Sequence, residues 1–333
     1  MNRLRIFFKN FAAGRKELFA RIGVFIGTAL AVTQIVEYVL NIPALESLTK
    51  SVSVGSTDLF AILSEPLVYL GIALVLALLA QTGFARYSRK FKDSDFRISI
   101  TMGDIFDCDG TIIIPSNNLF SSDLRMLGDR NSIHKQLIQR NRMPKGSQLS
   151  SAEDIERQTR ERLAEERYTA YVADREPYVF GGESYTAYQY GTLLPIEVNV
   201  DRKERNVMLF SMSEFLSPGI PSVRNEDLFL YIDRMWDFIE TNGIADRKLV
   251  IPLIGTGAAG VGKRKQVVAR YIMNTYITRA RRLRINELTV SIFPGDYLSG
   301  EINLAELKEY ADSLIKFPDW EFGESNAPTA GKK

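Results

Sequence analysis

The sequence predicts an α/β fold, in which a two-helix transmembrane hairpin precedes one three-layer α/β/α domain with a mainly parallel or mixed sheet. Two observations support this prediction. Two long apolar stretches lie in the first 85 residues, and from residue 97 onward segments with strand-like and helix-like patterns alternate. The chain has 333 residues, of which 45% are apolar and 25% charged, and this composition is typical of a folded protein.

The two apolar stretches cover residues 22–42 and 66–85. About 20 apolar residues in a helix span a hydrocarbon core of roughly 30 Å, so each stretch is long enough to cross a membrane. The second stretch contains no charged residue, whereas the first contains Gln34 and Glu37. These two polar side chains either reach the membrane interface or line a pore or a helix interface.

Two other interpretations of the apolar stretches are weighed against a membrane hairpin. A cleaved signal peptide has a shorter apolar core, of about 7–15 residues, followed by small residues, and the first stretch does not match this pattern. A buried hairpin in a soluble core would need apolar surroundings, and no later segment is apolar enough to wrap two such helices.

The distribution of basic residues predicts the orientation in the membrane. Segment 1–21 and the residues after the second stretch are rich in Lys and Arg, whereas Lys50 is the one basic residue of the loop 43–65. Basic loops remain on the cytoplasmic side, so we expect a multi-pass protein of the cell inner membrane with both termini cytoplasmic. Segment 1–21 is also amphipathic and is expected to lie along the inner leaflet.

After the apolar stretches, residues 86–96 are polar and are expected to form a linker, and the α/β domain is expected over 97–317. The tail, 318–333, is expected to be disordered. The region 120–185 is long for a connection and is interpreted as an insertion. We predict strands at 97–102, 111–115, 192–200, 206–212, 248–254 and 287–293, and helices at 150–171, 225–242, 263–283 and 302–315.

The chain contains one cysteine, Cys108, and one histidine, His134. A single cysteine excludes an internal disulfide and a cysteine-based zinc site, and a single histidine argues against a histidine-cluster metal site or a Ser-His-Asp triad. His134 lies in the predicted insertion and is expected at the surface; the alternative is contact with a ligand. The net charge of +2 gives no global field that would attract nucleic acid. We therefore expect no metal, no cofactor and no nucleic-acid partner.

The segment 255–262 is rich in glycine and lies between a predicted strand and a predicted helix. In this arrangement the glycines let the backbone approach a phosphate group, and the first N–H groups of the helix point at it. Lys263, Arg264 and Lys265 supply positive charge nearby. The alternative is a tight structural turn. The segment also matches the G-x-G-x-x-G dinucleotide-binding fingerprint, but the acidic residue expected about 20 positions later is missing.

Polar side chains also follow two of the predicted strands. Asp104 comes after the strand 97–102, and Asn117 and Asn118 come after the strand 111–115. A carboxylate can accept a hydrogen bond from an adenine amine, and asparagine side chains can bond ribose hydroxyls. The alternatives are a turn residue for Asp104 and an ordinary loop for the two asparagines.

Together these segments resemble the macro domain, an ADP-ribose-binding module, over about residues 97–315. That family pairs a Gly-Asp-Ile segment with an apolar strand that ends in an Asn-containing loop, and much later it has a strand, a G-T-G-x-x-G segment and a helix. The matching residues here are 103–105, 113–118 and 252–260. The resemblance implies a macro-like fold that binds an ADP-ribose derivative. The chain departs from the family at Pro115, which replaces the first Asn of its strand-end motif.

The resemblance also implies roles for individual residues. Asp104 and Ile105 would contact adenine, and one of the two asparagines would contact the distal ribose. Adenine would stack on Phe293 or Tyr297. Residues 190–192 resemble the middle glycine segment of the family. The diphosphate would lie in the loop formed by Gly255, Thr256, Gly257, Ala258, Ala259, Gly260 and Val261.

Two membrane helices fused to such a domain resemble the TM-macro effector of type II Thoeris anti-phage defence. In that family a TIR-domain partner converts NAD into histidine–ADP-ribose, the macro domain binds this signal, and the membrane part harms the infected cell. The resemblance implies a homo-oligomer that disrupts the membrane. The alternatives are a membrane-tethered ADP-ribosyl hydrolase, with Asn118 and Asp123 as candidate catalytic residues, and a passive anchor that carries a nucleotide sensor.

Overall fold

The computed structural model describes residues 86–91, 94–129, 131–144, 146–217, 220–223, 227–244, 246–255 and 264–316. All of them belong to one compact unit, Arg86–Lys333. The predicted amphipathic segment, the two predicted membrane spans and the predicted tail lie outside the described residues. Of the helices within these ranges, none combines the length and the apolar composition that crossing a bilayer requires.

A mixed sheet forms the centre of the domain, as predicted. Its strands are ordered β1-β2-β10-β9-β3-β7-β6, and β8 pairs with β7. From β2 to β7 all neighbours are parallel, whereas β1, β6 and β8 are antiparallel to their neighbours. The strands are β1 (Arg86–Lys90), β2 (Arg97–Met102), β3 (Thr111–Asn117), β6 (Leu193–Val200), β7 (Lys203–Ser217), β8 (Ile220–Ser222), β9 (Lys248–Pro252) and β10 (Glu287–Ile292).

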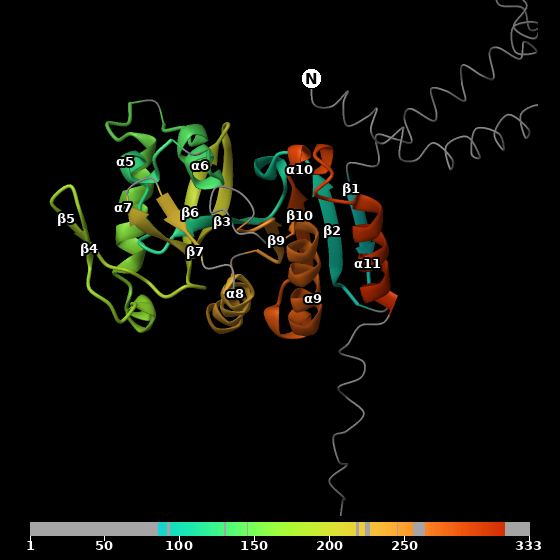
Figure 1. Cartoon of the computed structure of the whole chain (residues 1–333). Helices are drawn as coiled ribbons and strands as arrows, with labels where there is room; N and C mark the ends of the chain where they lie inside the picture. The colour runs from blue at the N-terminus through green and yellow to red at the C-terminus, as the bar shows by residue number, and fades with distance from the viewer. Residues whose placement is uncertain are drawn as a thin grey trace, which may run out of the picture. The chain divides into compact units, whose positions relative to one another are not determined.

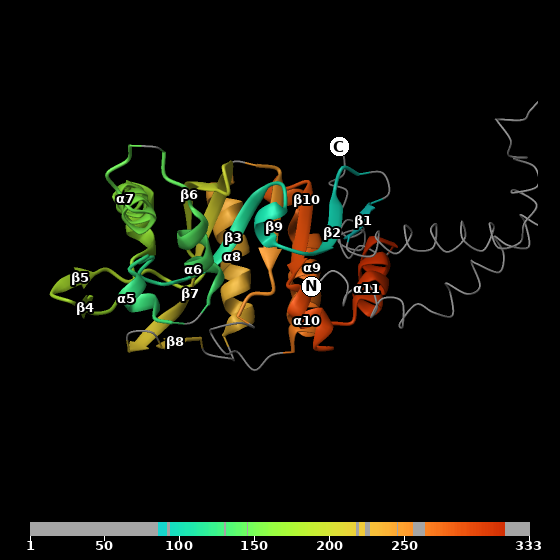
Figure 2. The ribbon, with the colours of Figure 1, turned by 90° about the horizontal axis from the view of Figure 1, so that it is seen from above.

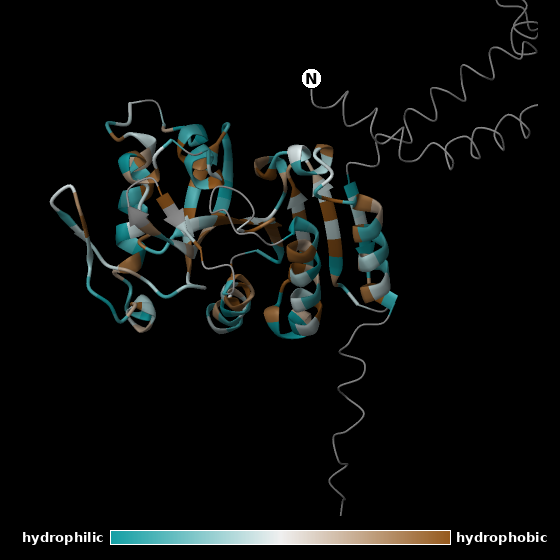
Figure 3. Cartoon of the chain, in the orientation of Figure 1, coloured by the Kyte–Doolittle hydropathy of each residue, from teal (hydrophilic) through white to brown (hydrophobic). Residues whose placement is uncertain are grey.

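Helices cover both faces of this sheet. Helix α6 (Ile133–Arg140) lies on one side, and α8 (Leu228–Asn242) and α9 (Lys265–Leu283) pack against each other on the opposite side (Figure 1 and Figure 2). Helix α11 (Leu304–Lys316) packs against α9 and β1. Figure 3 shows apolar residues in the central strands and hydrophilic residues on the outer surface of α11. The three-layer α/β/α arrangement predicted from the alternating pattern is therefore confirmed.

The central strand β3 shows why the core forms at this place. Its three consecutive isoleucines, Ile112, Ile113 and Ile114, are all 0% exposed. β-branched side chains favour extended backbone, and a strand covered by helices on both faces needs a continuous apolar run instead of an alternating one. The strand extends two residues beyond the predicted 111–115 and ends at Asn117.

The predicted helices are present, with shifted ends. Helix α8 ends at Asn242, and the next residue, Gly243, has a φ of +72°, which glycine adopts with little strain. Helix α7 (Ser151–Leu163) begins after the N-cap Ser150, which forms a capping box with Glu153. The prediction of one helix over 150–171 is too long, because the chain continues after α7 as the 3-10 helix η3 (Glu166–Tyr171).

The structure differs from the linker predicted over 86–96. Its first five residues form the edge strand β1, which pairs with β2 along its whole length. The Tyr87 hydroxyl donates a hydrogen bond of 2.6 Å to Asp312 Oδ1 of α11. An edge strand tolerates charged side chains because only one of its edges is paired. The polar composition of these residues is therefore compatible with a strand as well as with a linker.

The region 120–185, interpreted as an insertion, is folded and contributes to the layer around α6. It contains α5 (Leu124–Leu127), α6, α7, η3 and the hairpin of β4 (Tyr178–Phe180) and β5 (Glu183–Tyr185). Helix α6 packs on β3, and α7 packs on β6. This region therefore supplies the helices that cover one face at the β3–β6 end of the sheet.

Candidate functional site

The carboxyl ends of the parallel strands surround a cavity of about 550 Å³. Its wall is formed by residues at or after the ends of β2, β3, β9 and β10, together with part of β7 and the start of α6. Helix α10 (Pro294–Leu298), which follows β10, contributes Pro294 and Asp296. In sheets of this kind, ligands bind in the crevice outside the carboxyl ends of the strands. The cavity is therefore the candidate site.

The segment after β2 brings Asp104 and Ile105 into the cavity wall. Asp104 caps a 3-10 helix, and its Oδ1 accepts a hydrogen bond of 3.0 Å from Phe106 N. Its Oδ2 accepts a hydrogen bond of 2.5 Å from Arg140 Nη1, and the Arg140 guanidinium carbon lies 4.7 Å from the centroid of the Phe106 ring. The Asp104 side chain remains 38% exposed. Its carboxylate is thus held in a fixed direction and is still accessible to a ligand.

Of the two asparagines at the end of β3, only Asn117 lies in the cavity wall. Its Oδ1 accepts hydrogen bonds of 3.1 Å from Leu119 N and Ser121 N, and its Nδ2 donates one of 2.9 Å to Ser121 O. These bonds hold the loop after β3 and use one of the two amide hydrogens of Asn117. Asn118 is 1% exposed and is outside the wall, so the structure does not bring it to the predicted site.

The glycine-rich segment begins at the cavity. Gly255 lies in the wall and has a φ of +76°, where glycine is favoured. The helix after this segment, α9, begins at Lys265, and the side chain of its N-cap residue, Arg264, makes no capping hydrogen bond. A helix N-terminus presents backbone N–H groups that can bind an anion. The other predicted members of the loop, Thr256, Gly257, Ala258, Ala259, Gly260 and Val261, lie outside the described residues.

Lys265, the first residue of α9, places a cation in the cavity wall. Its Nζ lies 2.6 Å from Asp296 Oδ1 and 2.7 Å from Glu301 Oε2. Burial lowers the pKa of Lys265, but the hydrogen bonds to Asp296 and Glu301 outweigh this effect, and the pKa is raised. The ammonium group therefore remains charged and fixed next to the N-terminus of α9.

His134 is a wall residue that the sequence analysis expected at the surface. The prediction of a surface position is wrong, because the side chain is 1% exposed and lines the cavity. Its Nδ1 lies 3.2 Å from Ser116 Oγ, and its Nε2 lies 3.1 Å from Ser122 Oγ. Burial lowers the pKa of His134 to about 4, so the ring is neutral at pH 7. Leu137 and Ile138, three and four residues later, are the signal that placed it on a buried helix face.

Phe293 and Tyr297 occupy different environments. Phe293 follows β10, is 64% exposed and lies in the cavity wall. Tyr297, in α10, is 6% exposed and is not part of the wall. An exposed aromatic ring at a cavity can stack on a base. The structure therefore favours Phe293, and not Tyr297, as the ring that would meet adenine.

The middle glycine segment, residues 190–192, lies outside the cavity wall. Gly191 has a φ of +98°, and a Cβ atom added there would lie 2.3 Å from Arg234 Cβ of α8. A glycine is therefore required at position 191, because α8 approaches too closely for a side chain there.

The candidate residues of the hydrolase alternative do not meet in the cavity, because neither Asn118 nor Asp123 is part of its wall. Asp123 caps α5 by accepting a hydrogen bond of 2.8 Å from Arg125 N. The Arg125 guanidinium also bonds the Asp123 carboxylate and lowers its pKa. Within the described ranges, no group of three or more His, Cys, Asp or Glu side chains could hold a metal ion.

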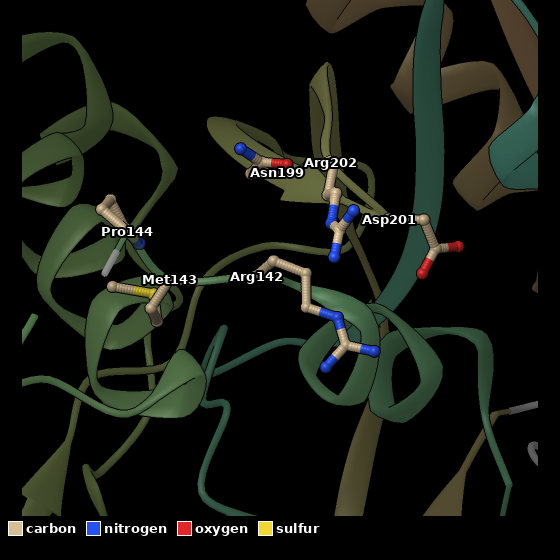
Figure 4. Close-up of a pocket in the computed structure, with 6 residues that line it drawn as sticks. All are labelled: Arg142, Met143, Pro144, Asn199, Asp201 and Arg202. Carbon is tan, nitrogen blue, oxygen red and sulfur yellow. The ribbon is translucent and has the colours of Figure 1, made fainter. Parts of the chain in front are cut away.

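A second cavity, of about 680 Å³, lies between the residues after α6 and the turn that joins β6 to β7 (Figure 4). It is lined by Arg142, Met143, Pro144, Asn199, Asp201 and Arg202. None of the predicted site residues belongs to it. It is larger than the first cavity, but the residue types expected for ADP-ribose gather only at the first.

Comparisons with known proteins identify the family. The model for the macro domain of the Thoeris protein ThsA matches residues 98–293. The Oceanobacillus iheyensis macrodomain with ADP is 11% identical, with a TM-score of 0.41, and the match covers 71% of this chain and 98% of that chain. The same macrodomain with MES bound is 12% identical, with a TM-score of 0.41, and the match covers 69% and 98%. No curated protein matches.

The family match spans more than half of the chain and runs from β2 to the end of β10. It includes most of the cavity wall, from Gly103 to Phe293. The resemblance stated from the sequence motifs is thus confirmed by an independent comparison. The chain belongs to the family of the Thoeris protein ThsA macro domain.

Proposed function

We propose that the cavity at the carboxyl ends of the strands binds an ADP-ribose derivative. The observation that carries this proposal is the arrangement of four elements around one cavity in a chain of this family. These elements are the Asp104 carboxylate, the Asn117 amide, the Gly255–α9 junction and the Phe293 ring. They match, in this order, an adenine amine, a ribose, a diphosphate and the face of a purine. The volume of about 550 Å³ is typical of a small-molecule site.

The ligand would bind through three contacts. Adenine would donate from its amine to Asp104 and stack on Phe293. The diphosphate would lie at the glycine-rich segment, where the N-terminus of α9 is positive. The distal ribose would meet Asn117.

A histidine attached to the distal ribose would make the ligand histidine–ADP-ribose. The start of α6 adds the polar side chains of Asn131, Ser132 and Gln136 to the wall, in addition to His134. These groups can donate to and accept from an amino acid moiety. This feature supports a conjugate in preference to unmodified ADP-ribose.

The membrane part would be the output of this receptor. The apolar stretches 22–42 and 66–85 are proposed to form a hairpin in the cell inner membrane, with both termini cytoplasmic. A signal made by a TIR-domain partner would bind the domain, change its homo-oligomeric assembly and lead to membrane disruption and death of the infected cell. Shifting such an equilibrium from 1:99 to 99:1 requires about 5.5 kcal/mol of differential affinity.

A titration separates this receptor from an enzyme. The full chain in an uncharged detergent is titrated with ADP-ribose and with histidine–ADP-ribose, while heat and product formation are followed together. We expect saturable binding of the conjugate without turnover, and loss of binding in Gly257→Glu, which adds a negative charge to the proposed phosphate loop. Val179→Glu adds the same charge to an exposed site on the β4–β5 hairpin and should bind normally. Turnover would replace the receptor with a hydrolase, and absence of binding would remove the proposal.

A second assay addresses the membrane part. The full chain is reconstituted in liposomes that contain a self-quenched dye, and histidine–ADP-ribose is added. Dye release is expected from the wild-type chain and not from Gly257→Glu. Tight binding without dye release would indicate a passive anchor that carries a nucleotide sensor.

A further inference from the structure

The second cavity contains two arginines whose charges are not balanced by a bonded partner. Arg142 and Arg202 both line it, and both are exposed. Neither side chain makes a salt bridge or a hydrogen bond within the described part of the chain. Figure 4 shows both side chains at the same opening, one from the residues after α6 and one from the β6–β7 turn.

The backbone holds these two arginines close to each other. Arg142 N donates a hydrogen bond of 2.7 Å to Asn199 O, and Asn199 N donates one of 2.9 Å to Asn141 Oδ1. Asp201 N lies 3.4 Å from Arg140 O. The end of α6 is thus fixed along the end of β6. A site built on two fixed segments binds with a smaller loss of conformational entropy.

The one acidic residue in this wall does not cancel the positive charge. Asp201 forms a salt bridge with Arg140, which also binds Asp104. The hydrogen bond from Arg140 lowers the pKa of Asp201, and the charges of Arg142 and Lys203 lower it further, so Asp201 is ionised. Arg140, Arg142 and Arg202 outnumber the carboxylates of Asp104 and Asp201, so the opening keeps a net positive charge. Two guanidinium groups at one opening match the planar, multiple hydrogen bonding that phosphate oxygens accept.

The turn that carries Arg202 is strained. Asp201 and Arg202 have φ values of +51° and +70°. Two-residue hairpin turns of this kind favour Asn and Gly, because other side chains are crowded when φ is positive. A glycine at 202 would relieve this strain but would remove a guanidinium group. Replacing Arg202 with glycine is thus expected to increase the stability of the domain and to weaken the binding of a ligand in this cavity.

From these observations we infer that this cavity is a second binding site, which takes a phosphate group. The phosphate belongs either to a soluble polyphosphate or to a lipid head group, and both present the same oxygens to the two arginines. A volume of about 680 Å³ leaves room for the group that carries the phosphate. This inference does not depend on the ADP-ribose cavity, because no wall residue is shared between the two.

Site-resolved arginine modification tests the inference. The full chain in an uncharged detergent is treated with phenylglyoxal, and the modified peptides are quantified by mass spectrometry. The probes are inorganic pyrophosphate, dioctanoyl phosphatidylglycerol, and dioctanoylglycerol as the lipid without phosphate. We expect a phosphate probe to slow modification of Arg142 and Arg202 about fivefold or more, and to leave Arg160, an exposed arginine of α7, unchanged. Protection by pyrophosphate indicates a soluble ligand, and protection by phosphatidylglycerol alone indicates a head group.

Two variants separate binding from folding. Arg202→Gly should resist denaturant as well as or better than the wild-type chain, yet pyrophosphate or phosphatidylglycerol should no longer protect its Arg142. Arg160→Gln should keep the protection. Protection by neither phosphate probe, or full protection of Arg142 in Arg202→Gly, would overturn the inference. ADP-ribose binding is measured in the same samples, so a failure of the first cavity to bind ADP-ribose is detected independently of the second cavity.

Discussion

Arg140 Nη1 lies 2.5 Å from Asp104 Oδ2, and this contact joins the end of α6 to the segment after β2. The same guanidinium group lies over the Phe106 ring, at 4.7 Å from its centroid. Asp104 is the residue proposed to accept from the adenine amine. Arg140 therefore fixes the direction of the carboxylate before a ligand arrives, which lowers the entropy lost on binding.

Replacing Arg140 with methionine should weaken adenine recognition selectively. The Arg140→Met variant keeps an unbranched side chain and removes the bond to Asp104. Hydrogen bonds to charged groups contribute about 1.5–3 kcal/mol, so we expect the affinity for ADP-ribose to fall about tenfold. The affinity for ribose 5-phosphate, which lacks adenine, should change less than about twofold on the same argument. Isothermal titration of the full chain in detergent measures both.

The matched control for this variant is Arg157→Met. Arg157 also joins two carboxylates, at 2.7 Å from Asp154 and 2.9 Å from Glu161, but on α7 and outside the cavity wall. Arg157→Met should leave the affinities for ADP-ribose and for ribose 5-phosphate unchanged. An equal loss for the two ligands in Arg140→Met would indicate a general structural role and would contradict the selective one.

Phe293→Ala should remove the stacking contact with the base. Stacking of a base on an aromatic side chain contributes about 1–3 kcal/mol, so the dissociation constant for ADP-ribose should rise about tenfold. Tyr297→Phe should leave it within about twofold, because Tyr297 is not part of the cavity wall. Val179→Ala, at a side chain that is 69% exposed on the β4–β5 hairpin, controls for loss of an exposed apolar group. Fluorescence polarisation with a labelled analogue gives all four constants.

His134 should make the stability of the domain depend on pH. Burial lowers its pKa from 6.5 to about 4, so below pH 6.5 the unfolded chain binds a proton that the folded chain does not. The stability is therefore complete above the unfolded pKa and decreases as the pH falls toward 4. At pH 5 the loss should be about 2 kcal/mol. Urea unfolding of the full chain in detergent at pH 8 and pH 5 measures it.

The variant for this prediction is His134→Gln, whose amide can bond a serine hydroxyl and does not titrate. Between pH 8 and pH 5, its free energy of unfolding should decrease by about 2 kcal/mol less than that of the wild-type chain. Equal decreases in both proteins would show that His134 is not the group responsible.

Gly191→Ala should destabilise the domain far more than Gly243→Ala. Both glycines have positive φ, at +98° and +72°, so an alanine is strained at either position. At Gly191 the new Cβ would also meet Arg234 Cβ at 2.3 Å, whereas at Gly243 no atom lies within 4 Å. We expect losses of more than about 3 kcal/mol and of about 1 kcal/mol respectively. Similar losses would show that α8 does not approach Gly191 as closely as described.

The fold of the domain could largely be predicted because its core strands are strongly patterned. The short run of β-branched isoleucines in β3 favours a buried strand, and the spacing of apolar residues in α8 favours an amphipathic helix. The edge strand β1 could not be predicted, since its charged residues have no apolar alternation and its pairing with β2 is decided by the whole sheet. The short helix α10 has too few residues for a periodic pattern.

The candidate site could be predicted only where a motif marks it. Asp104, Asn117 and Gly255 lie at or after the ends of strands that end at one edge of the sheet, and they meet in the cavity. The sequence could not tell which of Asn117 and Asn118, or which of Phe293 and Tyr297, lines the cavity. The direction of a side chain at the end of a strand or in a short helix depends on the exact position of that residue, which the sequence does not give. Leu137 and Ile138 mark the buried face of α6 that includes His134, but the strand that α6 covers depends on how a long connection returns to the sheet, and no local signal encodes that.

The structure of the full chain with histidine–ADP-ribose bound is the most direct test of the proposed receptor. The prediction is density for adenine between Asp104 and Phe293, and for the diphosphate at Gly255 and the N-terminus of α9. A ligand found elsewhere, or a cavity that stays empty at saturating ligand, would contradict the proposal that this site reads an ADP-ribose signal.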